Sequence, residues 1–374
     1  MNRANAVKPP DMRSRFRGCL LGGAVGDALG APLEFLSLAE IRRQFGVAGL
    51  RDFALAYGRL GAITDDTQMT LFTAEGMIRS HARAADRGLC SPIAVTAHAY
   101  ARWLLTQGVV PHAMPFDVER YPGWLYGVRE LHRRRAPGNT CLSSLQEKQH
   151  SEEYAANDSK GCGAVMRMAP VGLAGWRFGW DTRYTFELGT SLGRLTHGHP
   201  SGYLPAGALA VMVQLLLTGC GVAQAAELAL ESLVAHEGHE ETDTAMRRAL
   251  RLGRDPSPIA SVPAELGEGW VGEEALAIGL YCALAASSSE EGLILAANID
   301  GDSDSTASIA GNLLGALNGV GAIPRRWMRE LELKKVVARI ADDLFDCVDW
   351  NLSGPTDEKV SPAARVHYRR YPPN

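Results

Sequence analysis

Two segments at opposite ends of the chain repeat glycine at the spacing of one helix face. These glycines are Gly22, Gly26 and Gly30 near the N-terminus, and Gly311, Gly315 and Gly319 near the C-terminus. Residues four apart lie above one another on the same face of an α-helix. Each glycine lowers helix stability by roughly 1 kcal/mol relative to alanine, so its repetition indicates that another backbone approaches closely. We therefore predict that helices at 22–30 and 311–319 pack against each other as a central pair.

Two short acidic motifs precede predicted apolar helices. Residues 64–67 have the sequence Thr-Asp-Asp-Thr, and residues 302–305 have the sequence Asp-Ser-Asp-Ser. Carboxylates mixed with hydroxyls are the ligands that Mg²⁺ and Mn²⁺ prefer. The predicted helix pair would carry the second motif toward the N-terminal segment, where Asp27 and Glu34 add carboxylates. Such a cluster repels itself unless cations neutralise it or some members stay protonated. The pattern favours a two-metal site assembled from both ends of the chain.

Each motif alone also has a simpler interpretation. Thr64 is a typical helix N-cap, and Asp65 and Asp66 in the first turn would interact favourably with the helix dipole. Such a cap contributes roughly 1 kcal/mol to stability without any function. The same interpretation fits Asp302 and Asp304 ahead of the second helix. Only the combination of the two motifs with the predicted helix pair favours the metal site.

The composition excludes several classes of protein. Of the 374 residues, 46% are hydrophobic and 21% are charged, which is typical of globular proteins. A net charge of −4 and a pI near 6.2 give no electrostatic basis for binding nucleic acid or an anionic membrane. No stretch approaches the ~18 consecutive apolar residues of a membrane span. The seven cysteines are widely spaced without a Cys-x-x-Cys motif, which favours a reducing, cytoplasmic location.

Helical periodicity dominates the sequence, strand-like alternation is scarce, and no βαβ rhythm is present. We predict an all-α, single-domain helical bundle at 13–350, with a polar N-terminal tail at 1–12 and a polar C-terminal tail at 351–374. Besides the segments above, helices are expected at 92–107, 123–134, 183–195, 203–218, 222–234, 242–252, 272–285, 290–298, 305–318 and 330–346. Longer irregular stretches, which often form lids or binding surfaces, are expected at 109–122, 136–160 and 252–269.

Several further motifs follow one another over residues 15–320. They are Gly-Gly-Ala-Val-Gly-Asp-Ala-Leu-Gly at 22–30 with Glu34, Thr-Asp-Asp-Thr-Gln-Met at 64–69, Gly-Cys-Gly-Ala-Val-Met-Arg at 161–167 with Pro170, Thr-His-Gly-His-Pro at 196–200, Trp-Val-Gly-Glu-Glu-Ala at 270–275 and Gly-Asp-Ser-Asp-Ser at 301–305. In this order they resemble the ADP-ribosylglycohydrolase family. That family includes the dinitrogenase-reductase-activating glycohydrolases and the ADP-ribosyl-acceptor hydrolases.

The resemblance implies an orthogonal all-α fold that holds two Mg²⁺ or Mn²⁺ ions. By position in the motifs, one ion would be held by Thr64, Asp65, Asp66 and Asp304, and the other by Asp302, Asp304 and Ser305. Asp304 would bridge both ions, with Glu34 nearby as a ligand or acid/base. Cleavage of a glycosidic C1″ bond needs a carboxylate that activates water or protonates the leaving group. Glu34 and Asp66 are the two candidates, and the sequence does not choose between them.

The resemblance also implies a binding loop for the diphosphate of ADP-ribose. This loop would consist of Gly161, Cys162, Gly163, Ala164 and Arg167, with His197 close to the ligand. Small residues let backbone N–H groups approach an anion. Without the family, the loop would be interpreted as a packed helix entry and the histidine as a core residue. Many family members carry asparagine at the position of Cys162, and a thiol does not reproduce the hydrogen bonds of an amide.

The leading hypothesis is a metal-dependent hydrolase that removes ADP-ribose from a modified acceptor. Arginine is the first choice of acceptor because the chain looks closest to the bacterial glycohydrolases, while serine and small ADP-ribosyl compounds remain alternatives. Two other classes compete with this hypothesis: a non-catalytic protein that binds ADP-ribose, and a two-metal phosphohydrolase acting on nucleotides. The expected partners are ADP-ribosylated protein, ADP-ribose and, as for some bacterial family members, an ADP-ribosylating toxin.

Overall fold

The computed structural model describes residues 10–113, 120, 122–254, 262–352 and 362–373, and within them the protein is almost entirely helical. The predicted all-α fold is confirmed. The only strands in these ranges form a short antiparallel hairpin of β1 (Leu55–Ala56) and β2 (Arg59–Leu60). The α-helices are α1 (Met12–Gly30), α2 (Leu38–Phe45), α3 (Asp65–Arg87), α4 (Pro92–Thr106), α5 (Gly123–Tyr126), α6 (Asn139–Glu147), α7 (Ala169–Phe178), α8 (Thr182–Arg194), α9 (Pro200–Leu217), α10 (Val222–Leu233), α11 (Glu240–Arg254), α12 (Gly272–Ala285), α13 (Ser289–Ala297), α14 (Ser303–Asn318), α15 (Arg325–Glu330), α16 (Lys334–Asp346) and α17 (Pro362–Arg370).

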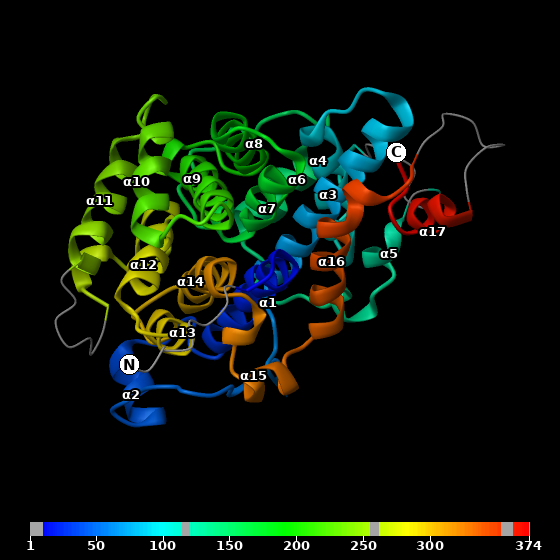
Figure 1. Ribbon diagram of the computed structural model, residues 1–374. Coiled ribbons are helices and arrows are strands. Elements are labelled where there is room, and N and C mark those ends of the chain that lie inside the picture. The colour runs from blue at the N-terminus through cyan, green and yellow to red at the C-terminus, as the bar shows by residue number, and fades with distance from the viewer. Residues whose placement is uncertain (1–9, 114–119, 121, 255–261, 353–361, 374) are drawn as a thin grey trace, which may run out of the picture.

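Helices α1 and α14 pack together at the centre of the molecule, as the glycine spacing predicted (Figure 1). A Cβ atom added to Gly22 would collide with the carbonyl oxygen of Gly311, and one added to Gly26 would collide with that of Ala307. Further along, a Cβ on Gly30 would meet the backbone of Asp304. The two helices therefore run antiparallel, with their backbones in contact. This arrangement places the end of α1 beside the start of α14.

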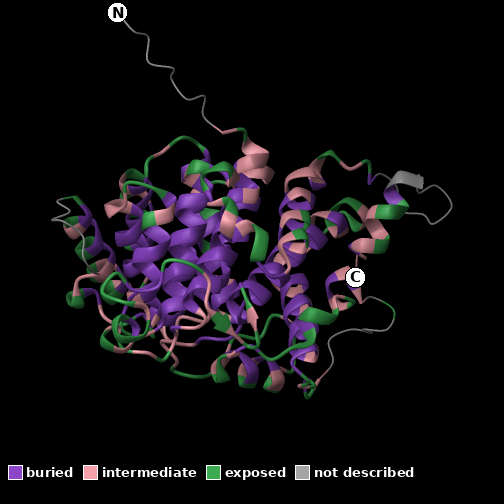
Figure 2. Ribbon diagram, turned by 90° about the horizontal axis from the view of Figure 1, so that it is seen from below, coloured by how far each residue is buried: buried purple, intermediate pink, exposed green. Residues whose placement is uncertain are grey.

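The other helices surround this central pair. In Figure 1, α10, α11 and α12 lie on one side of it and α3, α4 and α16 lie on the other. Figure 2 shows that the helices through the middle are almost wholly buried. Helix α9 is long and apolar enough to cross a membrane by length and composition, but 83% of it is buried inside the protein. It lies against α7, α8 and α10 as a core helix.

Five helices form in segments for which no helix was predicted: α2, α6, α7, α15 and α17. Helix α6 lies inside the stretch expected to be irregular, because Cys141, Leu142 and Leu145 share one buried helix face. Helix α7 has Pro170 in its first turn, where the missing N–H has no consequence. The helix expected at 123–134 is divided into α5 and a 3₁₀ turn at Arg129–His132. In the two other stretches expected to be irregular, residues 114–119, 121 and 255–261 lie outside the described residues.

The chain after residue 350, expected to be a polar tail, includes a helix that packs on the domain. Helix α17 ends next to Tyr371, whose side chain is fully buried. The Tyr371 hydroxyl donates to Asp343 Oδ2 of α16 at 2.8 Å, and Arg79 Nε of α3 donates to the carbonyl of Pro372 at 3.0 Å. The polar composition of this segment did not indicate that Tyr371 is buried, and the contacts of Tyr371 attach this segment to the domain. Of the N-terminal tail at 1–12, residues 1–9 lie outside the described residues.

Replacing Glu75 with glutamine is expected to lower the free energy of unfolding by about 3–5 kcal/mol. The Glu75 carboxylate is fully buried and lies 3.0 Å from Arg102 of α4 and 3.5 Å from Arg79. Without it, two buried guanidinium groups lose the negative charge of Glu75. Urea unfolding followed by circular dichroism measures the effect. Glu187→Gln, which removes an exposed ion pair with Arg183, is the matched control and is expected to change stability by under ~1 kcal/mol. Equal effects of the two substitutions would contradict this account.

Candidate active site

The first acidic motif is held in place by Asp27, near the end of α1. Both carboxylate oxygens of Asp27 accept from the backbone N–H of Thr64 at 3.0 Å. One of them also accepts from the N–H of Thr67 at 3.1 Å and from its hydroxyl. Thr64 itself is the N-cap of α3 and accepts from the N–H of Asp66 at 3.3 Å. The simple capping interpretation is therefore correct for Thr64, and Asp27 fixes the start of α3 to α1.

The second acidic motif forms the start of α14. Asp302 is the N-cap, and its Oδ1 accepts from the N–H of Ser305 at 3.3 Å. The same N–H approaches Asp304 Oδ1 at 3.1 Å. The N–H of Asp302 donates to the carbonyl of Glu268 at 2.9 Å, which ties this start to the loop before α12. Gly301 adopts φ +114°, and a Cβ there would collide with Glu268, so this turn requires glycine.

The antiparallel pairing of α1 and α14 brings the two motifs together. Asp65, Asp66, Asp302 and Asp304 are all at least 95% buried. Burial raises the pKa of Asp66, and the charges of Asp27, Asp65 and Asp302 raise it further. For Asp304, burial is again the main cause of a raised pKa, followed by Asp66, Glu34 and Asp302. Burial together with Asp302 and Asp65 raises the pKa of Glu34 to about 8. Carboxyl groups from three helices thus share one small, water-poor space.

The donor atoms of this cluster have the chemistry of a site for hard cations. All the side chains assigned to it as ligands provide oxygen, the donor that Mg²⁺ and Mn²⁺ prefer. Two buried oxygens, Asp66 Oδ1 and Glu34 Oε2, have no hydrogen-bond partner. Unpartnered buried carboxylate oxygens are costly unless a cation or a proton compensates them. In the described part of the chain, however, no three His, Cys, Asp or Glu side chains already have the arrangement of a metal site. Binding would require small movements of these side chains.

The glycine-rich loop at 161–164 lies against the second motif. Gly161 forms an isolated bridge with Val271, and the N–H of Cys162 donates to the carbonyl of Trp270 at 3.2 Å. The Cys162 thiol donates to Asp302 Oδ2 at 2.7 Å. Burial and the charge of Asp302 raise the pKa of this thiol well above its usual range. A protonated Cys162 therefore takes part in the acidic cluster, a contact that the sequence did not predict.

The His197 side chain packs against this loop. A Cβ added to Gly163 would lie 2.9 Å from Cys141 Sγ and 3.2 Å from His197 Cε1, so the loop approaches these two side chains this closely only with glycine at 163. The Nδ1 atom of His197 is 2.8 Å from the Thr196 hydroxyl. Burial, with a contribution from Arg167, lowers the pKa of His197 to about 3. The imidazole is therefore neutral at physiological pH.

Two residues predicted to bind substrate have fully buried side chains. Ala164 is fully buried. Arg167 is also fully buried, with its guanidinium carbon 4.5 Å from the centre of the Tyr100 ring and Nη2 donating to the Thr196 hydroxyl at 2.7 Å. A phosphate cannot reach this guanidinium unless these contacts break. Arg167 belongs to the 3₁₀ turn at Val165–Arg167 and Ala164 precedes that turn, so both side chains point into the core, and their part in binding a diphosphate stays a prediction.

Two aromatic residues near the cluster were not singled out from the sequence. Tyr57 lies in the turn between β1 and β2 with φ +51°, beneath the Arg135 guanidinium at 4.8 Å. Burial, with the charges of Glu34 and Asp304, raises the pKa of the Tyr57 hydroxyl. Phe35 follows Glu34 directly and has φ +118°, a conformation rare for a bulky residue. A positive φ is usual for glycine and asparagine, so the residue types Tyr and Phe do not predict these two backbone conformations.

The metal-free protein is expected to lose stability as the pH rises from 5 to 8. A carboxyl group whose pKa is raised in the folded state stabilises the protein fully below its unfolded pKa, and that contribution is lost as the pH rises toward the folded pKa. For Glu34 the loss runs from the ordinary pKa of 4.5 to the folded pKa of about 8 and is complete above it. Thermal unfolding in EDTA should therefore show that wild type loses more stability than Glu34→Gln between pH 5 and 8. A parallel pH dependence of the two proteins would contradict the burial of an uncompensated Glu34 carboxylate.

Known proteins share this chain's fold and sequence over nearly its whole length. Residues 8–352 match the profile of the ADP-ribosylglycohydrolase family. The ADP-ribosyl-[dinitrogen reductase] glycohydrolase of Rhodospirillum rubrum is 28% identical over 331 residues, which cover 87% of this chain and 92% of that protein. The ADP-ribosylarginine hydrolase Tri1 of Pseudomonas putida is 25% identical over 361 residues, which cover 92% of this chain and 81% of that protein.

A solved structure supports the same assignment. An ADP-ribosylglycohydrolase-related protein complex aligns with a TM-score of 0.63 and 26% identity, over 90% of this chain and 98% of that chain. The resemblance inferred from the motifs is therefore confirmed by sequence and by fold. The chain belongs to the ADP-ribosylglycohydrolase family and is a hydrolase.

Proposed function

We propose that this enzyme removes ADP-ribose from modified arginine by cleaving the glycosidic C1″ bond with water, at a site that holds two Mg²⁺ or Mn²⁺ ions. The observation that carries the proposal is the meeting of two acidic motifs from opposite ends of the chain, with the unpartnered oxygens of Asp66 and Glu34 between them. Buried carboxylate oxygens gathered at one point are unfavourable unless cations bind them. Membership of a hydrolase family supplies the reaction class.

The proposed ligands follow the two motifs. One ion would be held by Thr64, Asp65, Asp66 and Asp304, and the other by Asp302, Asp304 and Ser305. When bound, the two ions would supply a clamp for the ribose hydroxyls and a water of lowered pKa. The helix starts orient these side chains: the backbone N–H of Ser305 holds the Asp302 and Asp304 carboxylates, and Asp27 holds the turn of Thr64.

The carboxyl groups divide the acid and base roles by their surroundings. Glu34, with a pKa near 8, keeps its proton at neutral pH in the metal-free protein and suits protonation of the leaving nitrogen. Asp66 also has a raised pKa in the metal-free protein, but as a proposed ligand it would be ionised beside a bound cation, and its unpartnered oxygen suits acceptance of a proton from water. The neutral His197 beside the glycine loop adds no positive charge there, so the backbone N–H groups of the loop would provide the contacts to a diphosphate.

Arginine is the proposed acceptor because of the relatives that this chain matches. One of them is named for hydrolysis of ADP-ribosylarginine, and another for ADP-ribosylated dinitrogen reductase. Modified serine and small ADP-ribosyl compounds are the competing acceptors. A protein of this fold that only binds ADP-ribose would give no product, whereas one that splits the diphosphate would release AMP.

Product analysis on matched peptides tests the proposal. Purified protein with Mn²⁺ is incubated with arginine- and serine-ADP-ribosylated peptides in ¹⁸O-labelled water, and the products are weighed by mass spectrometry. The proposal predicts ADP-ribose that carries one ¹⁸O atom, and an unmodified arginine peptide. Release from the serine peptide alone would show that the acceptor is serine and not arginine. AMP as product would indicate phosphohydrolase activity, and intact peptides with bound ADP-ribose would indicate a binding protein.

A further inference from the structure

An exposed aromatic pair stands next to Glu34. The Phe35 and Trp270 rings stack nearly parallel, with centroids 5.7 Å apart and planes inclined by 19°. Phe35 is 74% exposed and Trp270 is 38% exposed. Most large aromatic side chains are buried, so a stacked pair that faces water is unusual in a monomer. The pair leaves a flat aromatic surface open beside the proposed acid.

The backbone of Phe35 is strained. Its φ of +118° is a conformation that side-chain-bearing residues rarely adopt. Glycine would occupy this position without strain. The ring is mostly exposed, so burial does not compensate the strain. Strain that folding does not repay is typical of positions kept for function.

The pair joins separate parts of the active site. Phe35 directly follows Glu34 at the end of the turn after α1. The Trp270 carbonyl accepts from the N–H of Cys162 in the glycine loop, and two residues earlier the Glu268 carbonyl accepts from the N–H of Asp302. The aromatic surface therefore lies next to Glu34, the proposed acid, and borders both the glycine loop and the start of α14.

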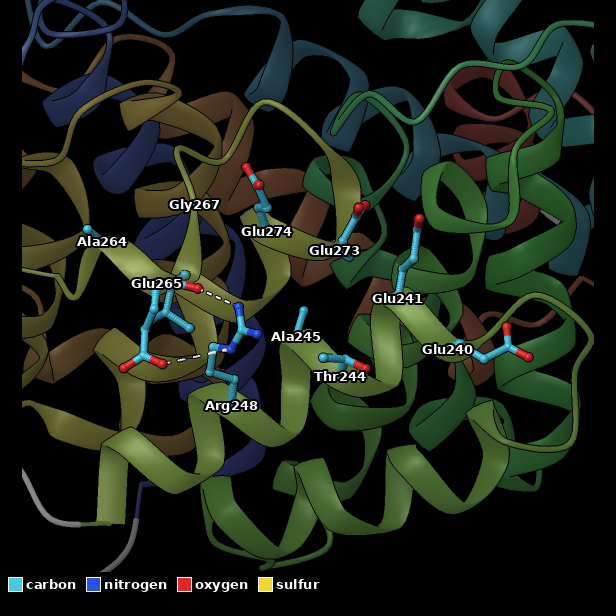
Figure 3. Close-up of a pocket in the computed structure, with 11 residues that line it drawn as sticks. Glu240, Glu241, Thr244, Ala245, Arg248, Ala264, Glu265, Gly267, Glu273 and Glu274 are labelled. Atoms are coloured by element: carbon cyan, nitrogen blue, oxygen red, sulfur yellow. Dashed lines mark hydrogen bonds and ion pairs between the residues drawn. The ribbon is translucent and has the colours of Figure 1, made fainter.

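The charge around the pair favours a cation. Trp270 Nε1 donates to the Glu268 carboxylate at 3.2 Å. The same loop borders a cavity of about 510 Å³, whose wall includes Glu241, Glu273 and Glu274 (Figure 3). In Figure 3, the Glu274 side chain extends toward the loop at Gly267, and its carboxylate accepts from the N–H of Gly269 at 3.2 Å. The Glu268 carboxylate beside the Trp270 indole disfavours an anionic acceptor at the aromatic rings.

We propose that the open face of the stacked Phe35 and Trp270 rings, called the aromatic clamp below, recognises the guanidinium of the ADP-ribosylated arginine; this inference rests on the proposed hydrolase function. A guanidinium stays planar and cationic when one nitrogen carries ribose, and it stacks on aromatic faces. A serine acceptor offers neither a plane nor a charge. The clamp therefore selects the acceptor, while the acidic motifs act on the ribose.

Four single variants test the clamp: Phe35→Ala, Phe35→Tyr, Phe35→Gly and Trp270→Ala. Each is measured for kcat/KM on an ADP-ribosylarginine peptide and for the Kd of free ADP-ribose, which lacks the acceptor. The two alanine variants should lose about tenfold in kcat/KM, with the Kd changed by less than twofold. Phe35→Tyr keeps an aromatic ring and should retain activity. Phe35→Gly should lose activity but unfold at the same or a higher temperature, because glycine relieves the strain.

A control variant and the results that would overturn the clamp complete this test. Tyr184→Ala removes another exposed aromatic residue, on α8, and should leave both quantities unchanged. Unchanged kcat/KM in the alanine variants, or equal losses in kcat/KM and in ADP-ribose affinity, would overturn the clamp. Cleavage of a serine peptide but not of an arginine peptide by wild type would also overturn it. Wild type that releases no ADP-ribose from any peptide would instead refute the proposed function.

Discussion

Asp304→Asn is expected to reduce ADP-ribose release by at least about a thousandfold, the order of loss seen when charged groups of a catalytic unit are removed. Asp304 is 97% buried at the start of α14 and is the proposed bridge between the two ions. The amide keeps the shape of the side chain but lacks the charge that would hold both cations. Single-turnover release of ADP-ribose from an arginine peptide, with saturating Mn²⁺, measures the loss.

The stability of this variant separates a catalytic role from a structural one. Burial and the charges of Asp66, Glu34 and Asp302 raise the pKa of Asp304, so removal of its charge relieves repulsion in the metal-free protein. In EDTA, Asp304→Asn should therefore unfold at the same or a higher temperature than wild type, while Mn²⁺ should stabilise it less. Asp300→Asn is the matched control, because Asp300 is exposed and its side chain accepts from the N–H of Leu38, away from the proposed ligands. Full activity of Asp304→Asn would contradict the assignment.

Gly26→Val is expected to prevent stable folding, with a loss in unfolding free energy of about 3 kcal/mol or more. A Cβ at this position would overlap the backbone of Ala307, and a backbone atom cannot move aside as a flexible side chain can. The central pair would have to separate, and the two acidic motifs would separate with it. Urea unfolding and the yield of soluble protein measure the effect.

The matched control for this substitution is Gly321→Val. Gly321 lies in a 3₁₀ turn after α14, with no atom within 4 Å of an added Cβ. Its change in unfolding free energy should stay within about 1 kcal/mol. Equal stability of Gly26→Val and wild type would show that α1 and α14 tolerate a wider separation. The glycine-dependent assembly of the site would then be wrong.

The central helix pair was predictable because its signal is local and repeated. Glycine at every fourth position on two helices, as at Gly22 and Gly311, has few explanations other than close packing. The all-α fold followed from helical periodicity, which is strong in long segments. The two acidic motifs were found in the same way, since each combines capping residues with more carboxylates than a cap needs.

The contacts behind the motifs were not predictable from residue type. Asp27 was named only as an additional carboxylate, yet its bonds to Thr64 and Thr67 fix the start of α3. Arg167 matched a binding motif, but a 3₁₀ turn directs it into the core against Tyr100. Such outcomes depend on the direction of a side chain in three dimensions, which spacing along the chain does not encode. The strained φ of Phe35 was hidden for the same reason.

The most direct test of the account is the dependence of ADP-ribose release on free Mn²⁺. Wild type stripped with EDTA is titrated with Mn²⁺, and the rate of release from an ADP-ribosylarginine peptide is recorded at each concentration. The account predicts no release before Mn²⁺ is added, and a rate that rises as the ions bind to the two acidic motifs. Undiminished release from fully stripped protein would contradict the claim that these motifs form a cation-dependent active site.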